Sequence, residues 1–236
     1  MANLYEFSSD KIDIFCLNVD ESGSMDGDSA NVIEGLKMYK KSFENFPEVN
    51  SIAVSLSKFS YDFYPGEFTS ISNMSTHYDA GGGTALYKSI VKGAKYLVSY
   101  VNEVANKTGC IPRATYIVFS DGESCTDDRT PASAAKAAIN DLNMAGINTV
   151  FVAFGQAVSS EFGKKLGFTC TLDVNNRNTL VNFLGVELSK SCKEQSKSMK
   201  SLGENFFSQA MGNENSKGYS KATSQALNDD DWISDI

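Results

Sequence analysis

Oxygen-bearing side chains follow the first apolar segment of the chain at a regular spacing. Residues 12–20 are mostly apolar, and the segment Asp20-Glu21-Ser22-Gly23-Ser24 comes at their end. One carboxylate and two hydroxyls therefore alternate along a turn that Gly23 permits. Hydroxyl, carboxylate and water oxygens are hard ligands that suit Mg²⁺. The spacing indicates a divalent-cation site, and Mn²⁺ and Ca²⁺ are also compatible with oxygen ligands.

Two further segments carry similar groups. Thr84 follows the run Gly81-Gly82-Gly83, and Asp121 follows an apolar segment at 114–119 within Ser120-Asp121-Gly122. Thr84 can also cap the helix that begins after it, because threonine is a favoured N-cap residue. A second carboxylate and a third hydroxyl are thus available, if the fold brings these segments to the first one.

The elements that must position these residues alternate between strand and helix. Apolar runs predict strands at 12–20, 51–59, 114–119, 147–154 and 168–174, and helical spacing predicts helices near 29–46, 86–104, 130–145, 159–166 and 177–193. This order predicts an α/β fold: a doubly wound, Rossmann-like, mostly parallel six-stranded sheet with helices on both faces. The helix-free stretch 51–72 predicts one antiparallel edge strand. Ligands of such sheets bind at the carboxyl ends of strands, where Asp20 and Asp121 lie.

The three segments together resemble the metal-ion-dependent adhesion site of the von Willebrand factor A (VWA) domains. The resemblance covers residues 10–192 and includes all five site positions: Asp20, Ser22, Ser24, Thr84 and Asp121. Within the family it is similar to the cytoplasmic bacterial type associated with tellurium resistance. In that type a T-D-G-E-P-T-D-D-like run follows the third long strand, and this chain has Ser124-Cys125 in place of the usual proline.

The resemblance implies a role for each residue. Ser22 and Ser24 would bind the metal directly, Thr84 directly or through water, and Asp20 and Asp121 mainly through water. A Mg²⁺ ion without a directly bound carboxylate keeps much of its charge and attracts an anionic ligand. A Glu or Asp of a partner protein would supply that ligand. The implied function is metal-bridged protein binding within a cytosolic assembly, with no catalysis.

Further residues near these segments are candidates for contact with the partner. They comprise four acids, the only histidine and two glycines: Glu21, Asp26, Asp28, Glu123, His77, Gly82 and Gly83. Because acids dominate this rim, we expect a partner that carries basic residues around one central carboxylate.

Composition excludes several other classes of function. The chain has 29 acidic and 21 basic residues, and no basic cluster of the kind that nucleic-acid binding needs. The longest uninterrupted apolar run, Val150–Phe154, is far shorter than the ~20 residues of a membrane helix. Five cysteines without a C-x-x-C motif, and no secretory signal, predict free thiols in the cytoplasm. The alternative function is a metal-dependent phosphoester hydrolase that uses the same oxygen ligands.

The composition changes near residue 194. Residues 194–236 carry four lysines and seven acids, a net charge of −3, and few aliphatic side chains. Such a segment buries too little apolar surface to offset its ordering entropy. We therefore expect a VWA domain at 1–193 and a flexible acidic tail at 194–236. The tail's end, Asp229-Asp230-Asp231-Trp232-Ile233, has the composition of a docking peptide for a basic, apolar groove.

Overall fold

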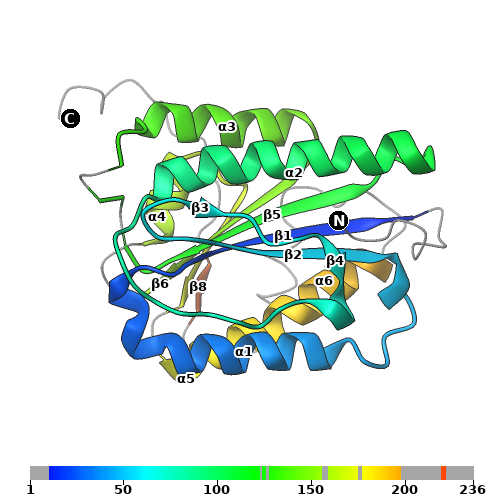
Figure 1. Ribbon diagram of the computed structural model, residues 1–236, viewed down its shortest axis with the longest axis horizontal. Helices are drawn as coiled ribbons and strands as arrows, with labels where there is room; N and C mark the ends of the chain where they lie inside the picture. Colours follow the sequence, from blue (N-terminus) through cyan, green and yellow to red (C-terminus); the bar gives the residue numbers. More distant parts are fainter. Residues whose placement is uncertain are drawn as a thin grey trace.

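A central, mostly parallel sheet organises the molecule (Figure 1). The computed structural model describes residues 11–122, 124–125, 128–155, 159–174, 177–197 and 219–221. The strands in chain order are β1 Asp13–Asp20, β2 Ile52–Phe59, β3 Phe63–Tyr64, β4 Thr69–Ser70, β5 Arg113–Ser120, β6 Asn148–Phe154, β7 Cys170–Val174 and β8 Tyr219–Lys221. Their spatial order is β3-β2-β1-β5-β6-β7-β8, and β4 also pairs with β2. The five long strands β1, β2, β5, β6 and β7 are parallel.

The predicted α/β fold class is confirmed, but the strand count of six is wrong. Within the described residues the sheet has eight strands, of which three are antiparallel. The expected edge hairpin at 51–72 exists, and it contributes two separate strands, β3 and β4, because Pro65-Gly66 interrupts pairing with β2. The third antiparallel strand, β8, lies in the segment expected to be a flexible tail. These strands are two or three residues long, too short for a periodic signal.

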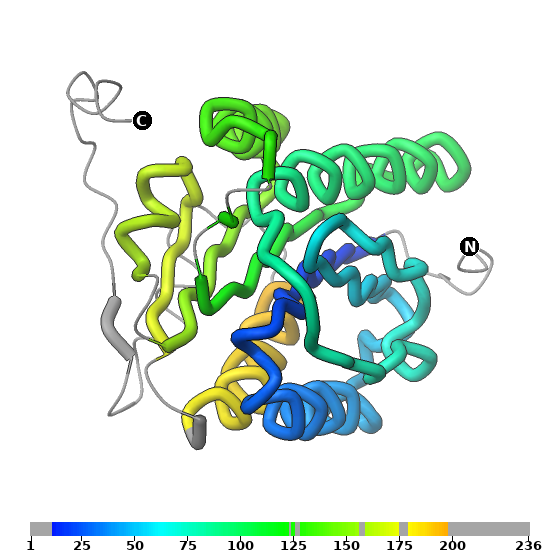
Figure 2. Tube along the Cα trace, turned by 60° about the vertical axis from the view of Figure 1, so that its left-hand side comes forward, coloured from blue at the N-terminus to red at the C-terminus, as the bar shows by residue number. Residues whose placement is uncertain are grey.

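Helices cover both faces of the sheet, and Figure 2 shows the same two layers from another direction. One face is packed by α2, α3 and α4, and the other by α1, α5 and α6. Their bounds are α1 Ser29–Ser42, α2 Leu86–Thr108, α3 Ala132–Met144, α4 Ser160–Lys165, α5 Arg177–Asn182 and α6 Leu188–Lys197. Short 3₁₀ helices span Gly23–Asp28, Val49–Ser51 and Ile71–Asn73.

The strand register brings the site segments to one edge of the sheet. Every residue of β1 is buried, as expected for a parallel strand with both faces covered. Val19 near the end of β1 pairs with Phe119 of β5, and Asp20 pairs with Phe59 of β2. The carboxyl ends of β1, β2 and β5 therefore meet, and the turns that follow them are neighbours.

The helix predicted at 177–193 is interrupted and extends further than expected. A π-helical turn, Phe183–Glu187, separates α5 from α6, and α6 continues to Lys197. The Ser189 hydroxyl lies 2.9 Å from the carbonyl oxygens of both Gly185 and Val186 and satisfies backbone groups that the wide turn frees. A Cβ on Gly185 would lie 2.5 Å from Met38 Cβ, so this turn packs directly on α1.

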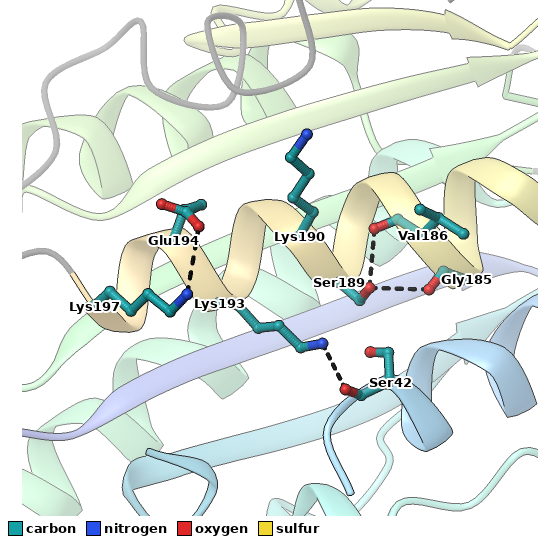
Figure 3. Close-up of a pocket in the computed structure, with 8 residues that line it drawn as sticks. All are labelled: Ser42, Gly185, Val186, Ser189, Lys190, Lys193, Glu194 and Lys197. Carbon is teal, nitrogen blue, oxygen red and sulfur yellow. Dashed lines mark hydrogen bonds and ion pairs between the residues drawn. The ribbon is translucent and has the colours of Figure 1, made fainter. Parts of the chain in front are cut away.

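Lysines of α6 hold it against the end of α1, beside a shallow groove of about 260 Å³ (Figure 3). Lys193 donates a hydrogen bond to the Ser42 carbonyl, and its ammonium lies 5.0 Å from the centre of the Phe43 ring. Partial burial and the neighbouring Lys197 lower the pKa of Lys193. Figure 3 shows that Lys197 is directed to Glu194, at 3.7 Å. The contacts of Lys193 join α6 to the end of α1, whereas the Lys197–Glu194 pair lies within α6.

All five cysteines are free, as their number and spacing predicted. In the part of the chain that the structure describes, no helix combines the length and apolarity needed to cross a membrane.

Candidate metal centre

Asp20 links the ends of the two central strands. Its side chain is fully buried, and its Oδ1 accepts a hydrogen bond of 2.9 Å from the Ser22 backbone N–H. Its Oδ2 accepts a 2.6 Å hydrogen bond from the hydroxyl of Ser120, the last residue of β5. Tyr78 donates its hydroxyl to the Asp20 carbonyl. Asp20 is therefore fixed by three hydrogen bonds at the point where β1 and β5 end.

Two serine hydroxyls and a second carboxylate lie next to Asp20. Ser22 Oγ is 3.1 Å from Ser24 Oγ, and Ser24 donates a 2.9 Å hydrogen bond to Asp121 Oδ1. The turn that carries the serines continues as the 3₁₀ helix at Gly23–Asp28, and its Met25 side chain is fully buried. Burial of Met25 anchors the turn and leaves Ser24 exposed at the surface. Asp20, Ser22, Ser24 and Asp121 are thus brought together.

The glycine turn is joined to the serine turn by backbone hydrogen bonds. The Gly23 N–H donates to the Gly82 carbonyl at 3.0 Å, and the Gly81 N–H donates to the Glu21 carbonyl at 2.7 Å. Gly82 has a φ of +88°, a conformation that favours glycine. Half-buried Thr84 follows this turn, so its segment borders the two serines.

Thr84 does not cap α2, contrary to one of its expected roles. The N-cap residue is Ala85, which makes no side-chain capping bond. The segment after β5 supplies the acceptor instead, because Asp128 Oδ2 accepts a 3.1 Å hydrogen bond from the Lys88 N–H in the first turn of α2. Burial alone would raise the pKa of Asp128, but hydrogen bonds from Ser124, Lys88 and Thr130 outweigh it and hold the pKa below its usual range.

The two carboxylates of the cluster are poorly stabilised in their ionised form. Burial raises the pKa of Asp20 to about 6, although hydrogen bonds from Ser120 and Ser22 oppose the shift. Burial also raises the pKa of Asp121, and the hydrogen bond from Ser24 opposes this. Within the described residues, no lysine or arginine forms an ion pair with either carboxylate. A divalent cation at the hydroxyls would supply the missing positive charge.

The donor set fits a hard cation. Among the described residues, no group of three or more His, Cys, Asp or Glu side chains could hold a metal ion. The cluster at the end of β1 instead combines hydroxyls with two carboxylates, which is the ligand chemistry of Mg²⁺ and related ions. Asp20 is engaged by Ser22 and Ser120, so a cation at the hydroxyls would not need this carboxylate as a direct ligand.

The residues expected at the rim fall into two groups. Glu21 and Asp28 are each only 8% exposed, so little of either side chain faces solvent. Glu21 Oε1 forms an ion pair of 2.9 Å with Lys58 and accepts a 2.6 Å hydrogen bond from the Asp79 N–H, and it thereby holds three segments together. The other described rim residues are accessible: Asp26, His77 and Gly82 are exposed, and Gly83 is half-buried. Glu123 lies outside the described residues.

Sequence reasoning missed two residues that shape the site and a third that borders it. Ser120 and Tyr78 position Asp20, and the exposed Tyr61 side chain packs on the glycine turn. Ser120 lies inside the S-D-G motif, so its place directly after a strand was an available signal. Tyr61 and Tyr78 had no such signal, because only the folded chain brings them to the site.

The mostly parallel sheet with helices on both faces is the α/β, Rossmann-like VWA fold, and solved structures share it. The pilus adhesin SpaC of Lactobacillus rhamnosus GG has a TM-score of 0.62 at 15% identity, over 80% of this chain and 31% of the adhesin. The mussel byssus protein PTMP1, solved with a zinc-occupied MIDAS motif, has a TM-score of 0.53 at 19% identity, over 76% of this chain and 48% of its own.

A third similar structure is the manganese-loaded TRAP protein of Plasmodium vivax. Its TM-score is 0.52 at 14% identity, and the match covers 73% of this chain and 72% of TRAP. No family model matches the sequence, and no curated protein matches it. The chain spans about a third of the adhesin and about half of the byssus protein, so the likeness concerns the fold of one domain.

Proposed function

We propose that this protein is a Mg²⁺-dependent protein-binding module. Ser22, Ser24 and Thr84 would hold the ion with their hydroxyls, while Asp20 and Asp121 would act through water. The observation that carries the proposal is that the side-chain oxygens of Ser22, Ser24 and Asp121 lie one after another, each within 3.1 Å of the next. They adjoin the buried Asp20 carboxylate, which has no cationic partner among the described residues. The ion would supply an electrophilic centre that attracts an anionic ligand.

The ligand we propose is a Glu or Asp side chain of a partner protein. A metal held by neutral hydroxyls retains most of its charge, so a carboxylate from outside is attracted more strongly than water. The surroundings are acidic, with exposed Asp26 near the turn and a chain charge of −8. Basic residues around the partner's carboxylate would offset this repulsion. Mn²⁺ and Ca²⁺ remain alternative ions because their oxygen chemistry is similar.

Other expectations from the sequence are proposals of the same kind. We propose a cytosolic assembly similar to those of the tellurium-resistance type, a VWA domain at 1–193 and a docking role for the acidic tail at 194–236. Because Gln195 and Ser196 are buried in α6, which ends at Lys197, the first residues after 193 pack with the domain and the proposed tail begins beyond them. Full-length protein with Trp232→Ala and Ile233→Ala tests the docking role. Unchanged partner binding would remove it.

The direct test of the function compares partner capture in Mg²⁺ and in EDTA. Wild-type protein, the Asp20→Ala, Ser22→Ala variant and the control Ser133→Ala, Asp141→Ala are immobilised and exposed to a lysate of the host cell. The control removes the same residue types from the exposed surface of α3. We expect one set of proteins that elutes with EDTA from the wild type and the control and is missing from the site variant.

If the same proteins are captured with and without EDTA, and by the site variant as well as by the wild type, the proposed function is contradicted. The same proteins, assayed with Mg²⁺ and a generic phosphoester, test the hydrolase alternative. Turnover that Asp20→Ala abolishes would favour hydrolysis over binding.

A further inference from the structure

An exposed aromatic ring lies against the glycine turn of the candidate site. Tyr61, in the turn between β2 and β3, is 59% exposed. A Cβ on Gly82 would lie 2.7 Å from Tyr61 Cε2, and a Cβ on Gly83 would lie 2.8 Å from Tyr61 Cε1. The absence of side chains at these two glycines therefore lets the ring rest on the turn. One side of the ring is packed, and the rest of it faces solvent.

Contacts connect this ring to the proposed metal ligands. Gly82 accepts the hydrogen bond from Gly23, which lies between Ser22 and Ser24, and Gly83 immediately precedes Thr84. The Ala85 N–H also donates a 2.6 Å hydrogen bond to the carbonyl of Ser60, the residue before Tyr61. The ring and the hydroxyls thus belong to one continuous surface, and a chain bound at the hydroxyls would pass beside the ring.

Charges around the ring favour an apolar occupant over a cationic one. The Lys88 ammonium donates a 3.1 Å hydrogen bond to the Tyr61 carbonyl, and Lys92 forms a 2.6 Å ion pair with Asp62. Asp62 offsets the charge of Lys92, but a guanidinium or ammonium placed over the ring would still approach the Lys88 ammonium, which opposes the attraction of a cation to an aromatic face. An aliphatic or aromatic side chain gains from covering the ring without that repulsion.

We propose that Tyr61 determines specificity by binding an apolar side chain of the partner that adjoins the metal-bound carboxylate. This inference rests on the proposed function. The occupant is an extended segment of a partner protein with Glu or Asp at the metal and an aliphatic or aromatic residue close to it in sequence. Tyr61 neither binds the metal nor positions its ligands, so its loss leaves the ion in place.

The experiment uses displayed peptides that have a fixed central glutamate and random flanking residues. The full-length protein selects them in Mg²⁺, and EDTA elutes them. The affinity of the most enriched peptide is then measured for wild-type protein, Tyr61→Ser and Tyr64→Ser. Tyr64 is a matched control, since it is a 47% exposed tyrosine of the same hairpin. Mn²⁺ affinity and thermal unfolding of each variant show that site and fold are kept.

We expect apolar residues to be enriched next to the glutamate. Tyr61→Ser should weaken peptide binding about tenfold, or about 1.4 kcal/mol, while Tyr64→Ser and the Mn²⁺ affinities remain unchanged. Enrichment of basic residues with no apolar residue next to the glutamate, or equal affinities for wild type and Tyr61→Ser, would overturn the inference and leave the proposed function standing. If no peptide elutes with EDTA, the proposed function itself fails and this inference fails with it.

Discussion

Alanine substitutions of the adjacent Gly82 and Gly83 distinguish two reasons for glycine in the site turn. One is a backbone conformation that only glycine adopts easily, and the other is contact with the Tyr61 ring. Both Gly82→Ala and Gly83→Ala place a methyl group under 3 Å from the Tyr61 ring. Only Gly82 has a positive φ, of +88°. Left-handed backbone costs an alanine about 1–2 kcal/mol. Both variants gain about 0.4–1 kcal/mol from the reduced freedom of the unfolded chain.

The gain and the ring contact are common to both variants, so they cancel in the comparison. We therefore expect Gly82→Ala to unfold with a free energy about 1–2 kcal/mol lower than that of Gly83→Ala. Urea unfolding in EDTA measures both values. Repeating it in a Tyr61→Ser background removes the ring, and the difference should persist because it arises from the backbone.

Equal stabilities of the two variants would refute the assignment of strain to Gly82. A difference that vanishes with Tyr61→Ser would show that the ring, and not the backbone, makes the glycine necessary.

Three further predictions concern the loops and helices around the site. Gly185→Ala should destabilise the fold by about 1–3 kcal/mol in urea, because its Cβ would lie 2.5 Å from Met38 Cβ, whereas Gly81→Ala, with open space around it, should not. Glu21→Gln should lower the free energy of unfolding by about 1–3 kcal/mol, because it breaks a largely buried ion pair with Lys58. Glu161→Gln, in an exposed pair, should change it by less than about 1 kcal/mol. Equal losses would contradict the role of Glu21 in holding the segments together. Mg²⁺ at about a hundred times its Kd should stabilise the wild type by about 2.7 kcal/mol and leave Asp20→Asn unchanged, as measured by urea unfolding with and without EDTA.

Much of the fold was predictable because its long elements carry strong patterns. The near-continuous apolar runs of β1, β5 and β6 and the helical spacing of α2 are local signals. The strands β3, β4 and β8 carry no such signal, because two or three residues cannot show a period. The π-helical turn arises from close packing on α1, which is a tertiary contact.

The candidate site shows the same division between local and tertiary signals. The spacing of Asp20, Ser22 and Ser24 placed them on one turn, and strand order placed Asp121 beside them. Sequence did not predict that Glu21 is buried against Lys58, since exposure depends on a partner 37 residues away. Likewise, the packing of Tyr61 on the glycine turn required the folded hairpin. The neighbouring acids Asp20 and Glu21 therefore have different roles, because one belongs to the oxygen cluster and the other pairs with Lys58.

Binding of Mn²⁺ by the intact protein, followed by electron paramagnetic resonance, tests the central claim most directly. The claim is that the Ser22 and Ser24 hydroxyls, with Thr84 and the two carboxylates, hold one divalent cation. We predict one bound Mn²⁺ per chain that Mg²⁺ displaces, loss of this binding in Ser22→Ala, Ser24→Ala, and unchanged binding in Ser133→Ala, Asp141→Ala. Unchanged Mn²⁺ binding by the double serine variant would contradict the account.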